Sequence, residues 1–548
     1  MSSRQEMQKA VGDDYDVIVV GAGINGAGIA RDAALRGLRV LMLDRDDIAF
    51  GTSSRSSKLI HGGLRYLEQY KFGLVMESVT ERGLLLRQAP HLIKALPFIF
   101  PVYHGGPQPL WLLRLGMLAY DALSGFRSPK LHRVLSPVGC ALAEPALRTS
   151  GLQGAPRYFD AATDDARLTL ATVIDGIAAG VHVLTWTRVC GLCHAQGQVC
   201  GVEVEDSIDG SRRVFKAHVV INAAGPWLDE ICRLDAPEMP PLLRCTKGIH
   251  IVVRKERLPL SNAVVCLHPE DGRVLFAIPW GDRTYCGTTD TDDSGRPEEV
   301  RATRADVQYM LAAMANYFPG CQLEEADVLS TWAGLRPLVA PSPAERLSAS
   351  QVSREHSIVV SSRGLVTVAG GKLTTYRKMA AEVVDKAQGV LRQRGYVAGG
   401  KRPPTKKRPL PGRWEGSGDP VVAVVQASQG RMTRDVARGL VEVYGAGATG
   451  VAERVARDAS LGALLSASPA TILAQVDHAV EAELAATLCD FFVRRTQIFF
   501  RDVHQGLEAL PVVAERMQKI CGWDDARRRH EEARYRAEVA RSRQWRED

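Results

Sequence analysis

Apolar and polar positions near the start of the chain follow the order expected of a strand, a tight turn and a helix. Residues 16–20 (DVIVV) are a short apolar run, the stretch 21–28 (GAGINGAG) is rich in glycine, and apolar residues then recur at helical spacing up to Ala34. A second apolar run covers residues 40–43 and ends on Asp44. The pattern predicts a βαβ unit of the kind that binds nucleotides.

The pattern changes twice further along the chain. Short β-rich runs separated by Gly, Gln, Asp and Ser occupy residues 181–221 and 245–290, as expected of antiparallel sheets. Residues 399–418 are rich in Gly, Pro and basic residues and predict a linker or exposed loop. Helical spacing dominates from about residue 419 onward. At 548 residues the chain is too long for a single hydrophobic core.

Composition places the chain among folded globular proteins, with 24% charged and 45% hydrophobic residues. The net charge of +7 modestly favours an anionic substrate, an anionic membrane surface or nucleic acid. No apolar run is long enough to span a bilayer, and the first residues lack the apolar region of a signal peptide. The eleven cysteines are scattered, which favours reduced thiols. We therefore expect a cytoplasmic protein.

The glycine-rich turn has the features that a pyrophosphate site needs. Its glycines allow a tight turn, close approach of the backbone to phosphate, and close packing of helix on strand. The helix N-terminus that follows favours an anion. Asp44 follows Gly23 by 21 residues, at the end of the second strand, where a carboxylate can accept hydrogen bonds from ribose. The predicted cofactor contacts here are Gly21, Gly23, Ile24, Asn25, Gly26 and Asp44.

Three later segments distinguish between dinucleotides. Residues 51–63 combine glycines with small hydroxyl side chains, residues 219–225 are a strand that ends in a glycine turn, and residues 366–376 again read as strand, glycines and helix. A helix N-terminus beside a flavin would stabilise the negative charge of its reduced ring, whereas a nicotinamide becomes neutral on reduction. FAD is therefore the predicted cofactor. Its further predicted contacts are Thr52, Ser53, Ser54, Ser57, Lys58, His61, Gly62, Gly63, Ala224, Gly225, Gly370, Gly371, Lys372, Leu373 and Thr374.

Five long motifs, in the same order, resemble those of the respiratory FAD-dependent glycerol-3-phosphate dehydrogenases. They are GAGINGAGIARDAALRG, TSSRSSKLIHGGLRYLE, NAAGPW, TWAGLRPL and AGGKLTTYRKMA. The resemblance covers nearly the whole chain and is looser in the helical tail. It implies an α/β FAD-binding fold, of the glutathione-reductase and D-amino-acid-oxidase-like kind, interleaved with an antiparallel β substrate domain and followed by a C-terminal α-helical domain.

Domain boundaries follow from the same resemblance. Residues 1–400 are expected to form the flavoprotein region, 401–418 the linker and 419–548 the C-terminal helical domain. Within the first region we expect FAD-binding parts at about 14–90, 150–230 and 350–395, and substrate-binding parts at about 91–149 and 231–349.

The resemblance further implies oxidation of sn-glycerol 3-phosphate to dihydroxyacetone phosphate, with electrons passing through FAD to a membrane quinone. Arginine suits a dianionic phosphate because it can make two parallel hydrogen bonds. Oxidation also needs a proton acceptor for the C2 hydroxyl, and His250 is the candidate. The alternative is that His250 is a core histidine whose hydrogen bonds are satisfied, and that the proton leaves by an arginine-assisted or water-relayed transfer. The predicted substrate contacts are Arg65, Tyr66, His250, Arg336 and Lys372, of which His250, Arg336 and Lys372 are the catalytic candidates.

Several further expectations concern partners. The protein is expected to lie peripherally on the cytoplasmic face of the inner membrane, and a homodimer is left open. Residues 110–123 are strongly apolar and indicate a buried helix rather than a surface in the bilayer interface. Alternatives are a glycerol-3-phosphate oxidase that uses oxygen, and a flavin-binding RNA-modifying protein for which residues 406–408 (KKR) would argue. No nucleic acid and no metal are predicted as partners, since Arg301 stands where a calcium loop starting at Asp290 needs glutamate.

Overall fold

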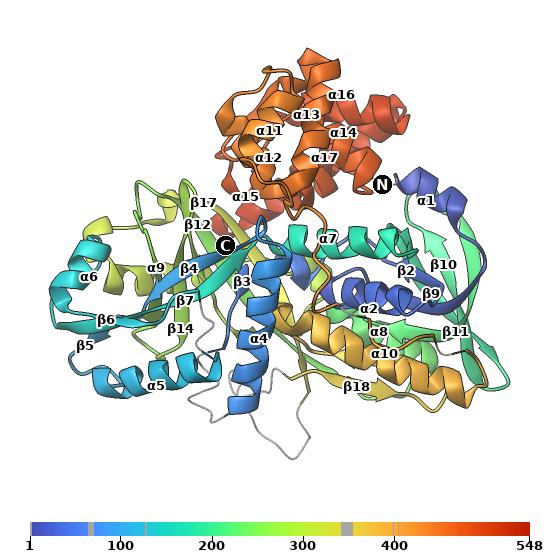
Figure 1. Ribbon diagram of the computed structural model, residues 1–548, viewed down its shortest axis with the longest axis horizontal. Coiled ribbons are helices and arrows are strands. Elements are labelled where there is room, and N and C mark those ends of the chain that lie inside the picture. The colour runs from blue at the N-terminus through green and yellow to red at the C-terminus, as the bar shows by residue number, and fades with distance from the viewer. Residues whose placement is uncertain (1–2, 64–70, 126–128, 341–354, 398, 404) are drawn as a thin grey trace.

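The computed structural model describes residues 3–63, 71–125, 129–340, 355–397, 399–403 and 405–548. Two sheets lie side by side, and the C-terminal helices cover them from one side (Figure 1). Strands of both sheets alternate along the chain, so the two parts are interleaved as the sequence predicts. Among the residues described, no helix has the length and apolar character needed to cross a bilayer.

The first sheet has the order β18-β19-β11-β1-β2-β8, with β10 and β9 extending it as an antiparallel hairpin beyond β11. The pairs from β19 to β8 are parallel. Parallel strands buried on both faces need continuous apolar runs, which the interior strands have. The strands are β1 (Asp14–Val20), β2 (Val40–Leu43), β8 (His182–Leu184), β9 (Thr187–Ala195), β10 (Gln198–Asp206), β11 (Arg212–Asn222), β18 (Ser357–Val360) and β19 (Val366–Ala369).

Three helices cover one face of this sheet, with α2 (Ile24–Leu35) between α7 (Asp165–Ala178) and α10 (Tyr376–Gln393). The approach of α2 to its neighbours is close because its inner face consists of Gly and Ala residues that are almost completely buried. Removing this apolar surface from water is the main force that holds the layer together. The opposite face of the sheet carries α8 (Leu228–Asp235).

The parallel arrangement explains why distant turns can meet. Strands β19, β11, β1 and β2 are consecutive neighbours, and each ends at one of the segments predicted to bind the cofactor. The carboxyl ends of parallel strands lie at the same edge of a sheet, which is where ligands bind in open α/β folds. The fold therefore brings the predicted turns to one edge.

The second sheet is mostly antiparallel, with the path β16-β12-β15-β14-β13-β4-β7-β3 and with β17 paired along β12. Helix α9 (Arg304–Tyr317) packs on it. Its strands are β3 (Leu59–Ile60), β4 (Ile93–Ile99), β5 (Val102–Tyr103), β6 (Arg133–Leu135), β7 (Leu152–Thr163), β12 (Leu243–Arg254), β13 (Ala263–Leu267), β14 (Val274–Trp280), β15 (Arg283–Gly287), β16 (Thr291–Asp292) and β17 (Val328–Val339).

The chain beyond residue 419 is helical apart from one small hairpin, and the predicted fold class is confirmed. The domain boundaries stay predictions. The helices are α11 (Pro420–Ala427), α12 (Arg434–Tyr444), α13 (Ala448–Arg457), α14 (Ala474–Ala482), α15 (Ile498–Arg501), α16 (Leu510–Cys521) and α17 (Asp525–Arg543), with β20 (Leu464–Ala467) and β21 (Ala470–Ile472). The remaining helices are α1 (Arg4–Ala10), α4 (Phe72–Gln88), α5 (Leu110–Leu123) and α6 (Pro137–Ala143).

The prediction that residues 110–123 form a buried helix is wrong for one face. The segment is α5, and Leu113, Met117 and Tyr120 are buried. Trp111, Leu112, Leu115 and Leu118 are instead 45–63% exposed. Apolar spacing gave the helix correctly, but it could not show that only one side of this helix has a partner.

Candidate active site

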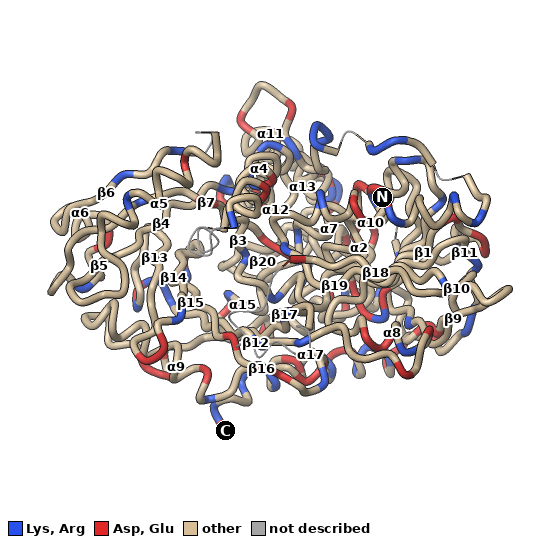
Figure 2. The backbone as a smooth tube through the Cα atoms, turned by 90° about the horizontal axis from the view of Figure 1, so that it is seen from below, with Lys and Arg blue, Asp and Glu red and all other residues tan. Residues whose placement is uncertain are grey.

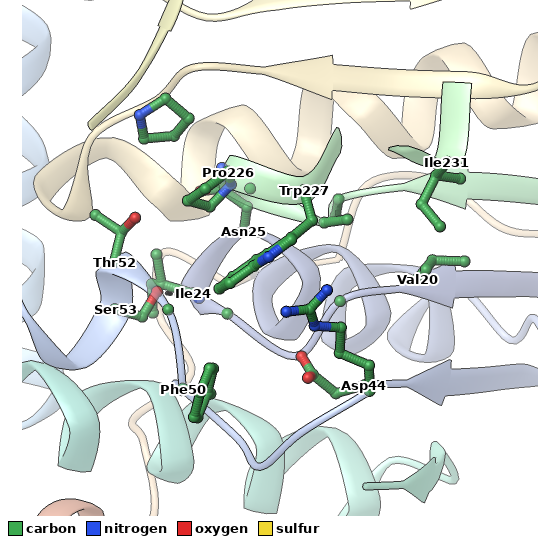
Figure 3. Close-up of a pocket in the computed structure, with 18 of the residues that line it drawn as sticks. Val20, Ile24, Asn25, Asp44, Phe50, Thr52, Ser53, Pro226, Trp227 and Ile231 are labelled. Carbon is green, nitrogen blue, oxygen red and sulfur yellow. Dashed lines mark hydrogen bonds between the residues drawn. The ribbon is translucent and has the colours of Figure 1, made fainter. Parts of the chain in front are cut away.

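The four glycine-bearing segments line one cavity of about 540 Å³ (Figure 3). The turn after β1 faces the turn after β11, and the loop at 51–56 and the turn at 370–373 complete the wall. The sequence predicted this convergence from patterns that lie more than three hundred residues apart. A single ligand that contacts all four segments must be extended, as a dinucleotide is.

Hydrogen bonds tie the four segments to one another and to the second sheet. Asn25 Nδ2 donates to the Gly370 carbonyl oxygen at 3.1 Å, which joins the first turn to the last. Ser53 Oγ accepts from the Ile24 amide at 2.9 Å. Thr52 Oγ1 donates to the Leu335 carbonyl oxygen on β17 at 2.6 Å. The cavity wall is therefore fixed in place before any ligand contributes.

The first turn fits a pyrophosphate in its backbone as well as in its sequence. A Cβ atom built on Gly26 would lie 1.8 Å from the Gly21 carbonyl oxygen, so only glycine allows α2 to start this close to β1. The helix begins after Gly23, which has no side chain to cap it; the Ile24 amide bonds to Ser53, and Ile24 and Asn25 both line the cavity. Such amides carry partial positive charge and bind phosphate well.

Asp44 lies at the end of β2 on the cavity wall, where a ribose contact is predicted. Its carboxylate accepts hydrogen bonds from the amides of Ala22 at 2.6 Å and Asp46 at 2.9 Å. Burial raises the pKa of Asp44 to about 7 despite these two hydrogen bonds. The two hydrogen bonds leave lone pairs on the carboxylate oxygens free. These oxygens can therefore accept further hydrogen bonds from hydroxyl donors such as those of a ribose.

The structure brings some of the predicted cofactor residues to the cavity and leaves others away from its wall. Those on the wall are Gly21, Gly23, Ile24, Asn25, Asp44, Thr52, Ser53, Ala224, Gly225, Gly370, Gly371, Lys372 and Leu373. Those away from the wall are Gly26, Ser54, Ser57, Lys58, His61, Gly62, Gly63 and Thr374.

The residues away from the wall make contacts that support it. The Lys58 ammonium pairs with the buried Asp165 carboxylate at 2.5 Å and donates to the Ser54 carbonyl oxygen at 3.2 Å. The Gly62 amide donates to Asp160 at 2.9 Å. The Thr374 hydroxyl accepts from the His61 amide at 3.2 Å. These contacts hold the 51–63 segment against β7, the start of α7 and the 3₁₀ turn that precedes α10.

Sequence reasoning missed several residues that the cavity includes. Arg45 follows Asp44 directly, and its guanidinium lies 4.4 Å from the centre of the Trp227 ring. Trp227 also donates to the Glu298 carboxylate at 2.6 Å. Phe50 and the stretch 187–190 complete this end. The NAAGPW motif could have indicated Trp227, but 187–190 comes from the β9–β10 hairpin and carries no local signal.

His250 and Arg336 lie together on the second sheet, beside the 51–57 loop of the cavity wall. Strand β12 places Gly248 and His250 on the same face, because residues two apart in a strand point the same way. A Cβ atom on Gly248 would lie 2.3 Å from Arg336 Nη2, so glycine leaves the room that the guanidinium occupies. His250 Nε2 lies 2.9 Å from Ser57 Oγ. One face of the sheet thus presents a cation and an imidazole next to the cofactor loop.

Arg336 is held by contacts around its guanidinium. Nη2 donates to Thr288 Oγ1 at 2.9 Å and to the Thr289 carbonyl oxygen at 3.0 Å, while Nη1 donates to Asp290 at 3.2 Å. These acceptors lie in the stretch 287–292 (GTTDTD), which starts at the end of β15. The Arg336 side chain remains 21% exposed. The guanidinium is therefore oriented in advance and still accessible.

His250 is buried and stacks on Trp332, with ring centres 4.5 Å apart. Burial, and then the charges of Arg336 and Lys58, lowers its pKa well below the ordinary value. Its Nδ1 atom has no hydrogen-bond partner within the part of the chain that the structure describes. The ring is thus neutral at physiological pH.

The depressed pKa of His250 makes stability depend on pH with a definite sign. The unfolded chain binds a proton at His250 below its ordinary pKa of about 6.5 and the folded chain does not, so folded-state stability falls as pH drops below that value. Lowering the pH from about 7.5 to about 5.5 should lower the free energy of unfolding by about 1.4 kcal/mol through this residue. Urea denaturation of wild type and His250→Gln at both pH values measures the difference. An equal pH dependence in the two proteins contradicts the assignment.

Lys372 lies on the cavity wall, at the start of the 3₁₀ turn Leu373–Thr375 that leads into α10. The predicted helix start thus lies next to the cavity. Arg65 and Tyr66 lie outside the described residues. The roles of all the named site residues stay predictions.

Comparison with known proteins agrees with this geometry. The FAD dependent oxidoreductase family matches residues 16–377, and the C-terminal domain of alpha-glycerophosphate oxidase matches residues 403–528. "Glycerol-3-phosphate dehydrogenase 2" of Mycobacterium tuberculosis is 38% identical over 96% of this chain and 88% of its own length. "Aerobic glycerol-3-phosphate dehydrogenase" of Bacillus subtilis is 35% identical over 94% of this chain and 93% of its own.

Solved structures give the same result. A glycerol-3-phosphate dehydrogenase from Bacillus halodurans, complexed with FAD, matches with a TM-score of 0.80 and 31% identity, and the match covers 99% of this chain and 98% of that one. An L-alpha-glycerophosphate oxidase from Mycoplasma pneumoniae shares the fold at a TM-score of 0.56 and 18% identity, over 73% of this chain and all of that one. The chain belongs to the family of FAD-dependent glycerol-3-phosphate dehydrogenases.

Proposed function

We propose that the protein oxidises sn-glycerol 3-phosphate to dihydroxyacetone phosphate with FAD as cofactor, and that a membrane quinone takes the electrons. The observation that carries the proposal is the meeting of the cavity with Arg336 and His250 at the 51–57 loop. The loop contributes Thr52 and Ser56 to the cavity and Ser57 to His250. A cofactor in the cavity and a phosphorylated alcohol on the sheet would therefore meet there.

Arg336 binds the phosphate group in this proposal. A guanidinium that is already oriented by Thr288, Thr289 and Asp290 loses little freedom when it binds an anion. Asp290 bonds to one of the Arg336 nitrogens, Nη1, at 3.2 Å and helps to hold the guanidinium in this orientation. Lys372 and Arg65 are proposed as further cationic contacts.

His250 takes the proton of the C2 hydroxyl in this proposal. Its neutral ring accepts the proton at Nε2, the atom that lies next to Ser57 Oγ. When bound, FAD supplies the oxidised ring that accepts the hydride from C2. Trp332 and Tyr285 pack around the imidazole and keep water away from it. General-base assistance of this kind contributes about a hundredfold to ten-thousandfold to rate.

Anaerobic addition of substrate tests the proposal. The purified protein should be yellow and should bleach when sn-glycerol 3-phosphate is added without oxygen, whereas glycerol should leave it oxidised. Oxygen and a soluble quinone analogue, offered separately to the reduced protein, then distinguish a dehydrogenase from an oxidase. We expect fast reoxidation by the quinone and slow reoxidation by oxygen; the reverse order supports the oxidase alternative.

The exposed face of α5 supports contact with a membrane, where a quinone would be found. Trp111, Leu115 and Leu118 are each more than half exposed. Phe72 and Met76 extend the apolar face onto α4, which packs against α5 through Val75, Val79 and Tyr120. Arg114 on α5 is also exposed, as are Lys130 and Arg133 in the segment that follows α5 along the chain. Apolar side chains fringed by basic ones are typical of a surface that lies in an anionic bilayer interface. We propose this as the contact with the cytoplasmic face of the inner membrane.

Two substitutions on α5 test the membrane contact. Changing Trp111→Ser and Leu115→Ser together should lower binding to vesicles of anionic phospholipid by roughly a thousandfold, since the two side chains together contribute roughly 4 kcal/mol when buried. Flotation with vesicles measures the bound fraction. Leu464→Ser, at a side chain of similar exposure on β20, is the control and should bind as wild type does. Equal binding of all three proteins would count against α5.

The RNA-binding alternative gains no support from the charges. Figure 2 shows Lys and Arg interspersed with Asp and Glu along the described chain. In the linker, Arg408 pairs with Asp175 and Arg402 with Asp385. These residues are neutralised by the protein itself.

A further inference from the structure

A cluster of buried charges behind the cavity takes no part in the reaction proposed above. Asp47 is completely buried, three residues after Asp44 along the chain. Its carboxylate accepts hydrogen bonds from Arg494 Nε at 2.5 Å and from Arg495 Nη1 and Nη2 at 2.7 and 2.8 Å. Burial alone would raise the pKa of Asp47, but the two guanidinium groups hold it below its ordinary value. The cluster is therefore ionised and fixed.

The same C-terminal segment also holds a second part of the cavity wall. Asp490 accepts from Trp186 Nε1 at 3.2 Å, and it accepts from Arg494 Nη2 at 2.6 Å. Trp186 directly precedes the stretch 187–190, which lines the cavity. Backbone hydrogen bonds of 2.7 Å run from Trp186 to Asp46 and from Thr187 to Asp44. The ionic contacts thus reach the two wall segments that flank Asp44.

Arg494 also contacts an aromatic residue that lines the cavity. The Arg494 guanidinium lies 5.4 Å from the centre of the Phe50 ring, and Phe50 lines the cavity on the same side as Asp44 (Figure 3). Residues 486–495 themselves are absent from the lining, among the residues that the structure describes. They contact residues of the cavity wall from the side that faces away from the cavity.

We propose that Asp47, Asp490, Arg494 and Arg495 form an ionic clamp by which the C-terminal helices position Asp44 and Phe50 for the adenosine half of FAD. Cofactor retention then depends on a part of the chain that does not touch the cofactor. Removing one member of a buried charge cluster leaves the other charges uncompensated, so the wall segments must move or admit water. The inference depends on FAD as the cofactor and is independent of the substrate.

FAD release from the full-length holoenzyme tests the clamp. Asp47→Asn keeps the shape of the side chain but removes its charge, and should weaken FAD binding by about tenfold or more, within the range usual for coupled sites. Asp477→Asn is the matched control. It breaks a two-bonded pair with Arg516 between α14 and α16, at 2.7 and 2.5 Å, and neither residue lines the cavity or bonds to a member of the clamp. FAD fluorescence on release measures both affinities without any substrate.

The clamp is supported if Asp47→Asn weakens FAD binding and Asp477→Asn changes it less than twofold. It is overturned if the two variants weaken binding equally, because the effect is then general destabilisation. Asp47→Glu, which restores the charge, should recover part of the affinity.

Hydrogen exchange on the wild-type protein provides a second test that needs no variant to fold. Coupling between two sites is reciprocal, so FAD should slow exchange of the backbone amides in residues 486–495 even though it does not contact them. Full-length protein with FAD is compared with the same protein after reversible removal of FAD. Slower exchange in this segment supports the clamp, and unchanged exchange overturns it.

Discussion

Arg336→Ala should reduce kcat/KM for sn-glycerol 3-phosphate by roughly a thousandfold while FAD stays bound. The expected loss of about 4 kcal/mol is that of truncating a charged group in a partly buried, hydrogen-bonded pair with an anion. Arg336 is next to Pro337 of the cavity wall but is itself absent from the lining, and it shares its face of the sheet with Gly248 and His250. The substitution therefore removes the proposed substrate contact and leaves the four turns in place. Steady-state kinetics and the ratio of flavin to protein absorbance measure the two quantities.

Two further variants make the Arg336 result specific. Arg336→Lys keeps the charge but loses the two-pronged geometry, so it should lose less activity than the alanine variant. Arg257→Ala removes an arginine in the turn after β12 that pairs with Asp327 at the surface, and should leave activity unchanged. Equal loss of FAD and of activity in Arg336→Ala would overturn its assignment to the substrate.

Gly26→Ala should abolish most FAD binding. The added Cβ would lie 1.8 Å from the Gly21 carbonyl oxygen, which belongs to the backbone and cannot rotate away. The start of α2 must then move, and its amides lose their alignment with the phosphates. Losing one or two such hydrogen bonds, at about 1.5–3 kcal/mol each, weakens binding roughly a hundredfold. The flavin content of the purified protein and the dissociation constant of added FAD report the effect.

Gly389→Ala is the matched control for the glycine prediction. Gly389 lies in α10, and a Cβ atom there would meet no other atom within 4 Å. Alanine is the better helix former, so this variant should keep its FAD and gain up to about 1 kcal/mol of stability. If Gly26→Ala purified with a full complement of FAD, the phosphate-binding role of the first turn would be wrong.

The nucleotide-binding sheet could be predicted from sequence because its signals are local. DVIVV, the glycine turn and Asp44 each fix a strand, a turn or a strand end within a few residues. Parallel pairing then brings the predicted turns together, since it places the carboxyl end of every strand at the same edge of the sheet. The meeting of segments near residues 21 and 371 needs no knowledge of side-chain contacts.

Other parts of the site depend on pairings that a single sequence does not show. The register of β12 with β17 sets Thr246 opposite Arg336, and only this register places the guanidinium over Gly248. The β9 residues 187–190 reach the cavity because Trp186 and Thr187 bond to the strand end at Asp44 and Asp46. Lys58, predicted as a cofactor contact, is engaged with Asp165, a residue more than a hundred positions away. Each of these placements depends on a contact between residues that are far apart in the sequence.

The exposed face of α5 illustrates a different limit. The spacing of its apolar residues is that of a helix, and it is the same whether a second protein layer, a lipid surface or water covers the outer side. Only the fold shows that Leu113 and Met117 face inward while Trp111 and Leu115 do not.

A crystal structure of the holoenzyme with sn-glycerol 3-phosphate tests the central claim most directly. The account predicts FAD extended through the cavity, with its phosphates at the amides after Gly23 and its ribose at Asp44. The substrate phosphate should lie within hydrogen-bond distance of Arg336, and the C2 hydroxyl should face His250. A flavin ring walled off from Arg336 and His250, or phosphates bound away from the turn after β1, would contradict it.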